Sequence, residues 1–160
     1  MDASLRRKPF QKKIGVSMKP GGFKEALKEG KLTGHVGLRE SICLIAEALG
    51  WELDEVRVKE VEPVIAEEEV FSQFYTAKRE QVKGTTQEAY GVVNGKERIH
   101  LFFTAFLGAT PSFDEVRIEG IPEIDAKVSP CWHGDDGTVA MIVSLIPRAI
   151  NAPPGILTYE

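Results

Sequence analysis

The sequence predicts an α+β domain built from one mixed, largely antiparallel sheet with helices packed on one face. Three observations predict this class: an amphipathic helical repeat at 38–49, strand-like alternation from 56 to 128, and a second apolar helical segment at 137–149. A length of 160 residues favours a single domain spanning the whole chain.

The N-terminal third contains both loop and helix signals. Residues 1–20 mix basic side chains with Pro9, Gly15 and Pro20, which predicts an extended or loop entry segment with room for one short strand. Residues 23–29 contain strong helix formers and end before Gly30. Residues 38–49 place apolar side chains three and four apart and end before Gly50, which predicts a helix. Cys43 falls on the apolar face of this helix, so we expect a buried, inert thiol there.

The middle of the chain predicts strands. Asn94-Gly95 separates two alternating runs and is typical of a tight hairpin turn. The run after it, 98–107, is almost entirely apolar, so we expect a central strand covered on both faces. Pro63 indicates an edge or a bulge in its strand. The predicted strands are 56–58, 63–65, 71–75, 82–93, 98–107, 114–119 and 124–128.

The last predicted helix, 137–149, is apolar on nearly every side and is therefore expected to be buried. Pro147 should kink or end it. The segment 152–157 contains two adjacent prolines, so we expect a non-helical, ordered cap.

Composition narrows the function classes. A net charge of −4, from 20 Lys and Arg against 24 Asp and Glu, gives no reason to expect a nucleic-acid or membrane partner. No apolar run is long enough to span a bilayer, and no signal-peptide pattern opens the chain. The two distant cysteines indicate a reduced, cytoplasmic protein. The three histidines lack metal-ligand spacing, so no metal is expected.

The sequence GHVGLRES at 34–41 opens the clearest helix. Two glycines three residues apart allow a ligand close to the backbone, and the first N–H groups of a helix attract anions such as a carboxylate. The alternative is that the glycines only form the turn into the helix. If the segment binds substrate, the candidate residues are Gly34, His35, Val36, Gly37, Arg39 and Ser41.

The sequence CWHGDDGT at 131–138 opens the last predicted helix similarly. Asp135 and Asp136 either cap the helix or bind a substrate ammonium group. His133 beside them is a candidate proton acceptor. Gln87 and Tyr90 lie in the middle of a predicted strand, where they either reach into a cleft or occupy an exposed face.

A dinucleotide-binding motif is missing from the sequence. No GxGxxG follows a predicted strand, and no GxxxxGK[ST] phosphate loop occurs. We therefore expect no Rossmann domain and no cofactor-binding residue in these 160 residues.

Several segments of the chain resemble the C-terminal domain of 2,4-diaminopentanoate dehydrogenase and its relatives. They are GHVGLRESICLIAEALGW (34–51), LDEV (53–56), EPVIA (62–66), IPR (146–148) and APPGILT (152–158), with DAS, RR and QKKIG near the start. These enzymes are similar to dihydrodipicolinate reductase. The resemblance covers nearly the whole chain.

The resemblance implies the substrate-binding and oligomer-forming half of an NAD- or NADP-dependent amino-acid dehydrogenase, whose cofactor is held by another domain. Before a hydride can leave the amine-bearing carbon, the ammonium group must lose a proton. His35 is our first candidate for the base because it lies beside the expected carboxylate site, and His133 is the second. The bulky CWHGDD segment departs from the family pattern.

Several alternatives stay open at this point. The chain could be an excised piece, a subunit that works with a separate nucleotide-binding protein, or a gene fragment. Two alternative functions belong to other classes: a non-catalytic module that binds an amino acid, and a structural oligomerisation module. In each case, strand 99–107 and helix 137–149 would support a homo-oligomer.

Overall fold

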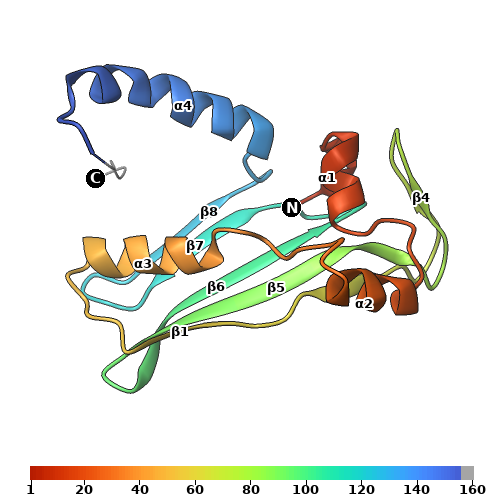
Figure 1. Ribbon diagram of the computed structural model, residues 1–160, viewed down its shortest axis with the longest axis horizontal. Helices are drawn as coiled ribbons and strands as arrows, with labels where there is room; N and C mark the ends of the chain where they lie inside the picture. Colours follow the sequence, from red (N-terminus) through yellow and green to blue (C-terminus); the bar gives the residue numbers. More distant parts are fainter. Residues whose placement is uncertain (156–160) are drawn as a thin grey trace. The chain divides into compact units, whose positions relative to one another are not determined.

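The computed structural model describes residues 1–155 and divides the chain into two compact units, Met1–Thr110 and the part that begins at Pro111 (Figure 1). The predicted α+β class is confirmed, and the paired strands are antiparallel. Within the described residues the strands form one four-stranded sheet and two separate hairpins rather than a single sheet.

The sheet of the first unit is built around its longest strand, β5 (Val82–Val93). β6 (Lys96–Phe106) pairs with one side of β5, while β1 (Glu55–Val58) and β2 (Glu62–Ile65) follow each other along its other side. The predicted turn at Asn94-Gly95 is confirmed, with φ values of 51° and 69°. The irregularity expected near Pro63 is also present, as a register shift between Val64 and Ile65.

The prediction that 98–107 forms a central strand covered on both faces is wrong. Within the described strands β6 pairs only with β5, and Phe102 on its outer face is 61% exposed. On the inner face, Ile99 and Ala105 are buried. The apolar run therefore forms a strand with one buried and one exposed face. The prediction failed because apolar residue type alone does not distinguish a buried face from an exposed one.

The helix α3 (Leu38–Ala48) confirms the predicted helix and packs on the inner face of the sheet. Ile42 is fully buried above Gly91, where an added Cβ would lie 2.8 Å from the Ile42 side chain. The glycine thus lets the helix approach β5 closely. The buried stripe is narrower than expected, and Cys43 is exposed, so the prediction of a buried thiol is wrong.

The expectation of an extended segment over 1–20 is also wrong. This region contains the 3₁₀ helix η1 (Ala3–Leu5) and the helix α1 (Lys8–Lys13), and α2 (Pro20–Lys28) begins at its end. Pro9 and Pro20 lie in the first turns of α1 and α2, where the missing N–H of proline costs no helical hydrogen bond. The two prolines thus begin helices instead of marking an extended segment.

Buried Gln11 anchors α1 to its surroundings. Its Nε2 donates to the carbonyls of Ser4 (3.3 Å) and Arg6 (2.7 Å), and its Oε1 accepts from the hydroxyl of Ser72 at 2.6 Å. Ser72 belongs to a short hairpin of β3 (Val70–Phe71) and β4 (Thr76–Ala77). The strand predicted over 71–75 is therefore mostly the turn of this hairpin.

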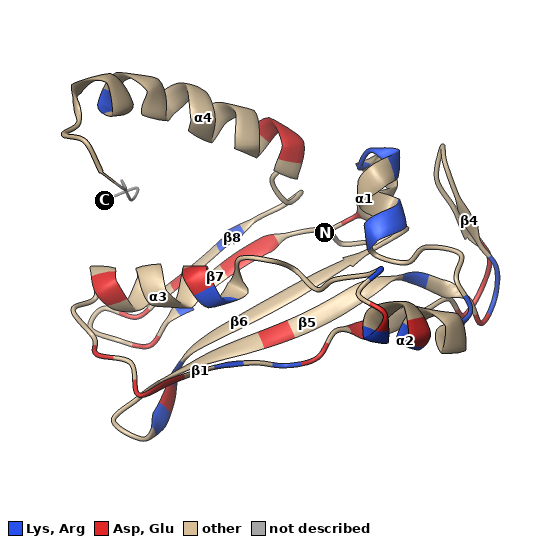
Figure 2. Ribbon diagram, in the orientation of Figure 1, with Lys and Arg blue, Asp and Glu red and all other residues tan. Residues whose placement is uncertain are grey.

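The second unit contains the hairpin of β7 (Asp114–Ile118) and β8 (Ile124–Val128), as predicted, followed by α4 (Gly134–Asn151). None of the residues of α4 is buried, so the prediction of a buried helix is wrong. Charge occurs only in its first and last turns (Figure 2), with the signs that suit the helix dipole.

Pro147 lies inside α4 and does not end it, so of the two predicted alternatives, a kink or an end, the second is wrong. The helix continues for one further turn, in which the Asn151 side chain donates to the Pro147 carbonyl at 2.8 Å. The chain leaves the helix at Ala152, as expected for the proline-rich cap, and Ile156 and Leu157 of that cap lie outside the described residues.

Candidate functional site

The glycine turn at 34–37 is present and leads directly into α3. Gly37 occupies the N-cap with a φ of 109°, a left-handed conformation that favours glycine. Gly34 is required for a different reason: an added Cβ would collide with the Gln87 side chain and lie 2.6 Å from Val61 Cγ2. Both glycines of the motif therefore serve the local geometry of the turn.

Gln87 on β5 holds this turn against the sheet. Its Oε1 accepts from the backbone N–H of His35 at 2.8 Å, and its Nε2 donates to the carbonyl of Lys59 at 3.0 Å. The residue is only 8% exposed, and both ends of its amide are engaged by backbone. We therefore assign Gln87 to positioning the turn.

The ring of His35 lies flat against Phe103 of β6. The ring centroids are 4.3 Å apart and the planes differ by 16°. Partial burial lowers the pKa of His35 below its ordinary value of 6.5, and the positive charge of Lys13 lowers this pKa further. The imidazole is therefore neutral at physiological pH and able to accept a proton.

An open hollow lies beside the His35 ring, and its volume of about 250 Å³ includes open solvent. Its walls come from α1, the loop before α3, and strands β5 and β6. The lining residues are Phe10, Lys13, Ile14, Thr33, Gly34, His35, Thr85 and Phe103. An aromatic floor, two hydroxyl groups, a neutral imidazole and one ammonium group together suit a small organic anion.

Four predicted residues of the same motif, the N-cap Gly37 and the three described next, do not line this hollow. Arg39 donates to the carbonyl of Val56 on β1 at 3.2 Å. The Val36 side chain is 70% exposed, and Ser41 is an exposed residue of α3 whose N–H donates to the Gly37 carbonyl at 2.9 Å. The sequence placed all of them at one anion site, whereas the structure directs them to different surroundings.

The residues predicted near 133–136 form a local cluster at the start of α4. His133 is the N-cap residue, and its Nδ1 lies 3.2 Å from a carboxylate oxygen of Asp136. Asp135 and Asp136 both occupy the first turn, as expected for residues that complement the helix dipole. The 250 Å³ hollow is lined by residues of the first unit alone.

The outer face of the sheet carries a charged and aromatic cluster that sequence reasoning missed. The Glu88 carboxylate accepts a short hydrogen bond from the Tyr90 hydroxyl and lies 3.0 Å from His100 Nε2 and 3.5 Å from Lys59 Nζ. The rings of Tyr90 and His100 stack at 4.6 Å. The pairing of β5 with β6 brings His100 beside Tyr90, whereas Lys59, whose backbone N–H donates to the Glu88 carbonyl at 2.9 Å, comes from the segment between β1 and β2.

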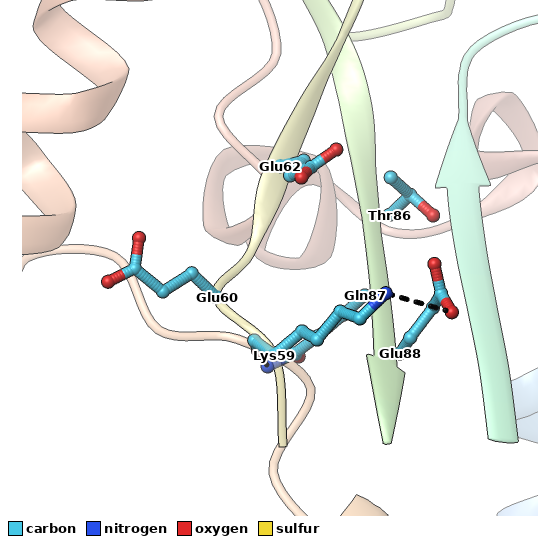
Figure 3. A pocket seen from close by; sticks show the side chains of 6 residues that line it. All are labelled: Lys59, Glu60, Glu62, Thr86, Gln87 and Glu88. Atoms are coloured by element: carbon cyan, nitrogen blue, oxygen red, sulfur yellow. Dashed lines mark hydrogen bonds and ion pairs between the residues drawn. The ribbon is translucent and has the colours of Figure 1, made fainter. Parts of the chain in front are cut away.

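Hydrogen bonding within this cluster shifts three pKa values. The Tyr90 hydroxyl lowers the pKa of Glu88 and raises that of Lys59, and in turn the Glu88 carboxylate raises the pKa of Tyr90. A second hollow of about 200 Å³ lies beside the ion pair of Lys59 and Glu88 (Figure 3). Its lining residues are Lys59, Glu60, Glu62, Thr86, Gln87 and Glu88.

Residues 1–155 contain neither a candidate metal-ligand cluster nor a candidate membrane-spanning helix. No group of three or more His, Cys, Asp or Glu side chains in this range is arranged to hold a metal ion. No helix in the same range has the length and apolar character needed to cross a membrane.

Comparison with known proteins places these features in context. The family model of the 2,4-diaminopentanoate dehydrogenase C-terminal domain matches residues 4–160. The 2,4-diaminopentanoate dehydrogenase of Acetoanaerobium sticklandii is 35% identical over 149 residues, which make up 91% of this chain and 42% of that protein. The chain thus spans less than half the length of this relative.

A solved structure is also similar in fold. The amine dehydrogenase from Mycobacterium smegmatis matches with a TM-score of 0.82 at 18% identity, over 99% of this chain and 47% of that one. At this level of identity the likeness establishes the fold, consistent with the α+β arrangement described above.

Proposed function

This chain belongs to the 2,4-diaminopentanoate dehydrogenase C-terminal domain family, and we propose that its 160 residues form the substrate-binding part of an NAD- or NADP-dependent amino-acid dehydrogenase. The hollow beside His35 is the observation that carries this proposal. It combines a neutral imidazole with an ammonium group and an apolar floor, as an amino-acid substrate requires.

His35 is the proposed proton acceptor. A substrate ammonium group has no lone pair until it loses a proton, so a nearby base is needed before the carbon–nitrogen unit can be oxidised. The lowered pKa of His35 keeps the ring unprotonated near neutral pH. Stacking on Phe103 and the tether from the backbone to Gln87 orient the ring.

The described part of the chain does not fit a dinucleotide cofactor. The paired strands of its sheets are antiparallel, and no parallel β–α–β unit of the dinucleotide-binding kind occurs among them. We therefore assign no cofactor-binding residue to this chain. A nucleotide-binding domain or separate subunit would supply the nicotinamide.

His133, Asp135 and Asp136 remain a second candidate group for contacting the substrate ammonium. Their support is the pairing of His133 with Asp136 at the exposed start of α4. An Asp135→Asn variant that binds substrate as the wild type does would remove Asp135 from the proposal.

Thermal stability of the purified chain tests the main proposal. We expect 2,4-diaminopentanoate to raise the unfolding midpoint, whereas NADH and NADPH should not raise it. A ligand at a hundredfold excess over its Kd stabilises the native state by about 2.7 kcal/mol. His35→Ala should weaken the response, and His100→Ala, on the outer face of the sheet, should not.

The result could also contradict this function. A shift with a nucleotide alone would mean that the chain binds the cofactor. No shift with either class of ligand would favour a structural module. Binding of the amino acid without activity, even after a nucleotide-binding partner is added, would favour a non-catalytic amino-acid-binding module.

A homo-oligomer formed through the sheet is a further part of the proposal. One support is the outer edge of β6, which pairs with no other described strand along most of its length. A second support is the exposed ring of Phe102 on the outer face of the same strand. Phe102→Asp should convert an oligomer to monomers in sedimentation experiments. An unchanged mass for this variant would exclude β6 as the interface.

We also propose a cytoplasmic location. Cys43 and Cys131 are both free thiols, as is usual in a reducing compartment. Fractionation of cells that express the protein tests this location.

A further inference from the structure

Lys13 is the charged group that distinguishes the hollow beside His35. Of the eight lining residues it alone carries a full charge at neutral pH, and no carboxylate lines the hollow. Among residues 1–155, no acidic side chain forms an ion pair with its ammonium group. The hollow is therefore a positively charged site whose cation is available to a ligand.

Two groups of the 34–41 motif, which was expected to bind the carboxylate, make hydrogen bonds to other parts of the protein. The backbone N–H of His35 donates to Gln87, and the Arg39 guanidinium donates to the carbonyl of Val56. Neither group is therefore directed into the hollow. This leaves the ammonium of Lys13 as the strongest anion-binding group in it.

The backbone that carries Lys13 is well anchored. The neighbouring Ile14 is only 5% exposed, and Gln11 in the same helix makes hydrogen bonds through both ends of its amide. The Lys13 side chain itself is exposed, so it can reach a ligand without unfolding its helix. Lys12, the preceding residue of α1, is also exposed and does not line the hollow.

We propose that Lys13 recognises the carboxylate of an aliphatic amino-acid substrate and that the amine end of this substrate then lies toward His35. The proposal rests on the function proposed above and assigns a specificity role to a residue outside the glycine motif. Phe10 and Phe103 would contact the aliphatic carbons between the two charged ends. Thr33 and Thr85 supply hydroxyl groups that can complete the hydrogen bonding.

Binding of a carboxylate has a consequence for His35. Burial lowers the pKa of the imidazole and the positive charge of Lys13 lowers it further, while β5 and β6 contribute only the uncharged Thr85 and Phe103 to this hollow. A carboxylate that neutralises Lys13 removes this effect. The substrate ammonium beside His35 lowers the pKa of the ring in any complex, so the pKa of His35 should be higher with a carboxylate ligand than with a ligand that leaves the charge of Lys13 uncompensated.

The test compares 2,4-diaminopentanoate with its primary amide, which differs only at the carboxyl group, by calorimetric titration of the full chain. The wild type should bind the acid about ten to a hundred times more tightly, as expected for a charge-assisted contact. Lys13→Met should bind both probes equally and keep the wild-type affinity for the amide. Lys13→Arg should retain the preference, and Lys12→Met should match the wild type.

A second readout does not depend on affinity. In NMR titrations of the imidazole, Lys13→Met should raise the pKa of His35 without any ligand, whereas Lys12→Met should leave it unchanged. In the wild type this pKa should be higher in the complex with the acid than in the complex with the amide, because both ligands bring an ammonium group and only the acid neutralises Lys13. A structural role for Lys13 would not produce this pattern.

The outcomes separate this inference from the proposed function. If the wild type prefers the acid and Lys13→Met keeps that preference, Lys13 does not recognise the carboxylate. The proposed substrate-binding function would still stand. If the wild type binds neither probe, the proposed function fails and the role of Lys13 fails with it.

Discussion

Replacing Gln87 by leucine tests whether the glycine turn is held to the sheet by a single side chain. Gln87 is 8% exposed, and its amide makes hydrogen bonds of 2.8 Å to the His35 N–H and 3.0 Å to the Lys59 carbonyl. Leucine has a similar volume, so Gln87→Leu removes both hydrogen bonds and leaves little cavity. The variant therefore isolates the polar contribution of this residue.

The expected magnitude follows from these two contacts. A buried intramolecular hydrogen bond contributes about 0.5–1.5 kcal/mol net, so losing two should lower the free energy of unfolding by about 1–3 kcal/mol. The backbone N–H of His35 would also lose the hydrogen bond that ties it to the Gln87 side chain on β5. Affinity for 2,4-diaminopentanoate should fall with stability, because the ring of His35 depends on this backbone for its position.

Urea unfolding followed by circular dichroism measures the first effect, and calorimetric titration measures the second. Thr104→Val is a suitable control because Thr104 lies on the outer face of β6, opposite Thr86. A loss below about 0.5 kcal/mol with unchanged affinity would refute the reasoning, because two buried hydrogen bonds are expected to contribute about 1–3 kcal/mol.

Three further predictions concern the core, the glycine turn and pH. Ile42→Ala should cost about 2–5 kcal/mol in unfolding experiments, and Ile45→Ala, at a residue that is 37% exposed, should cost clearly less. Gly34→Ala should weaken ligand binding in calorimetry, because the new Cβ collides with the Gln87 side chain; unaltered binding would show that the turn can shift freely. Because the pKa of His35 is lowered on folding, the unfolded chain binds more protons below about pH 6.5, so stability should decrease as the pH falls through that window. Urea unfolding across this pH range should show a smaller decrease for His35→Gln, and an identical decrease would contradict the assignment.

Local sequence signals predicted the elements whose cause is itself local. The repeat of apolar residues predicted α3 almost to the residue, because a helix that packs on a sheet needs one apolar side. Alternation and the Asn94-Gly95 turn predicted the hairpin of β5 and β6, because backbone geometry at the turn depends mainly on those two residues. Resemblance in the same stretches identified the family correctly.

Burial was predicted poorly, because it depends on what surrounds an element. The apolar residues of β6 and α4 indicated covered strands and helices, yet Phe102 is exposed and α4 has no buried residue. The helix α1 was missed, and α2 begins three residues before the predicted helix over 23–29, for a related reason. Pro9 and Pro20 disrupt a helix interior but are favourable in a first turn, and the sequence alone did not distinguish these positions.

For the candidate site, the sequence by itself determined a glycine turn that leads into a helix and identified His35 as the candidate base within it. Tertiary structure decided which residues surround that histidine. Gln87 and Phe103 reach it from two strands, and Lys13 reaches it from a helix that the sequence did not predict. The physical reason is that a turn is specified by the conformational limits of its own residues, whereas a binding site is formed by side chains that only folding brings together.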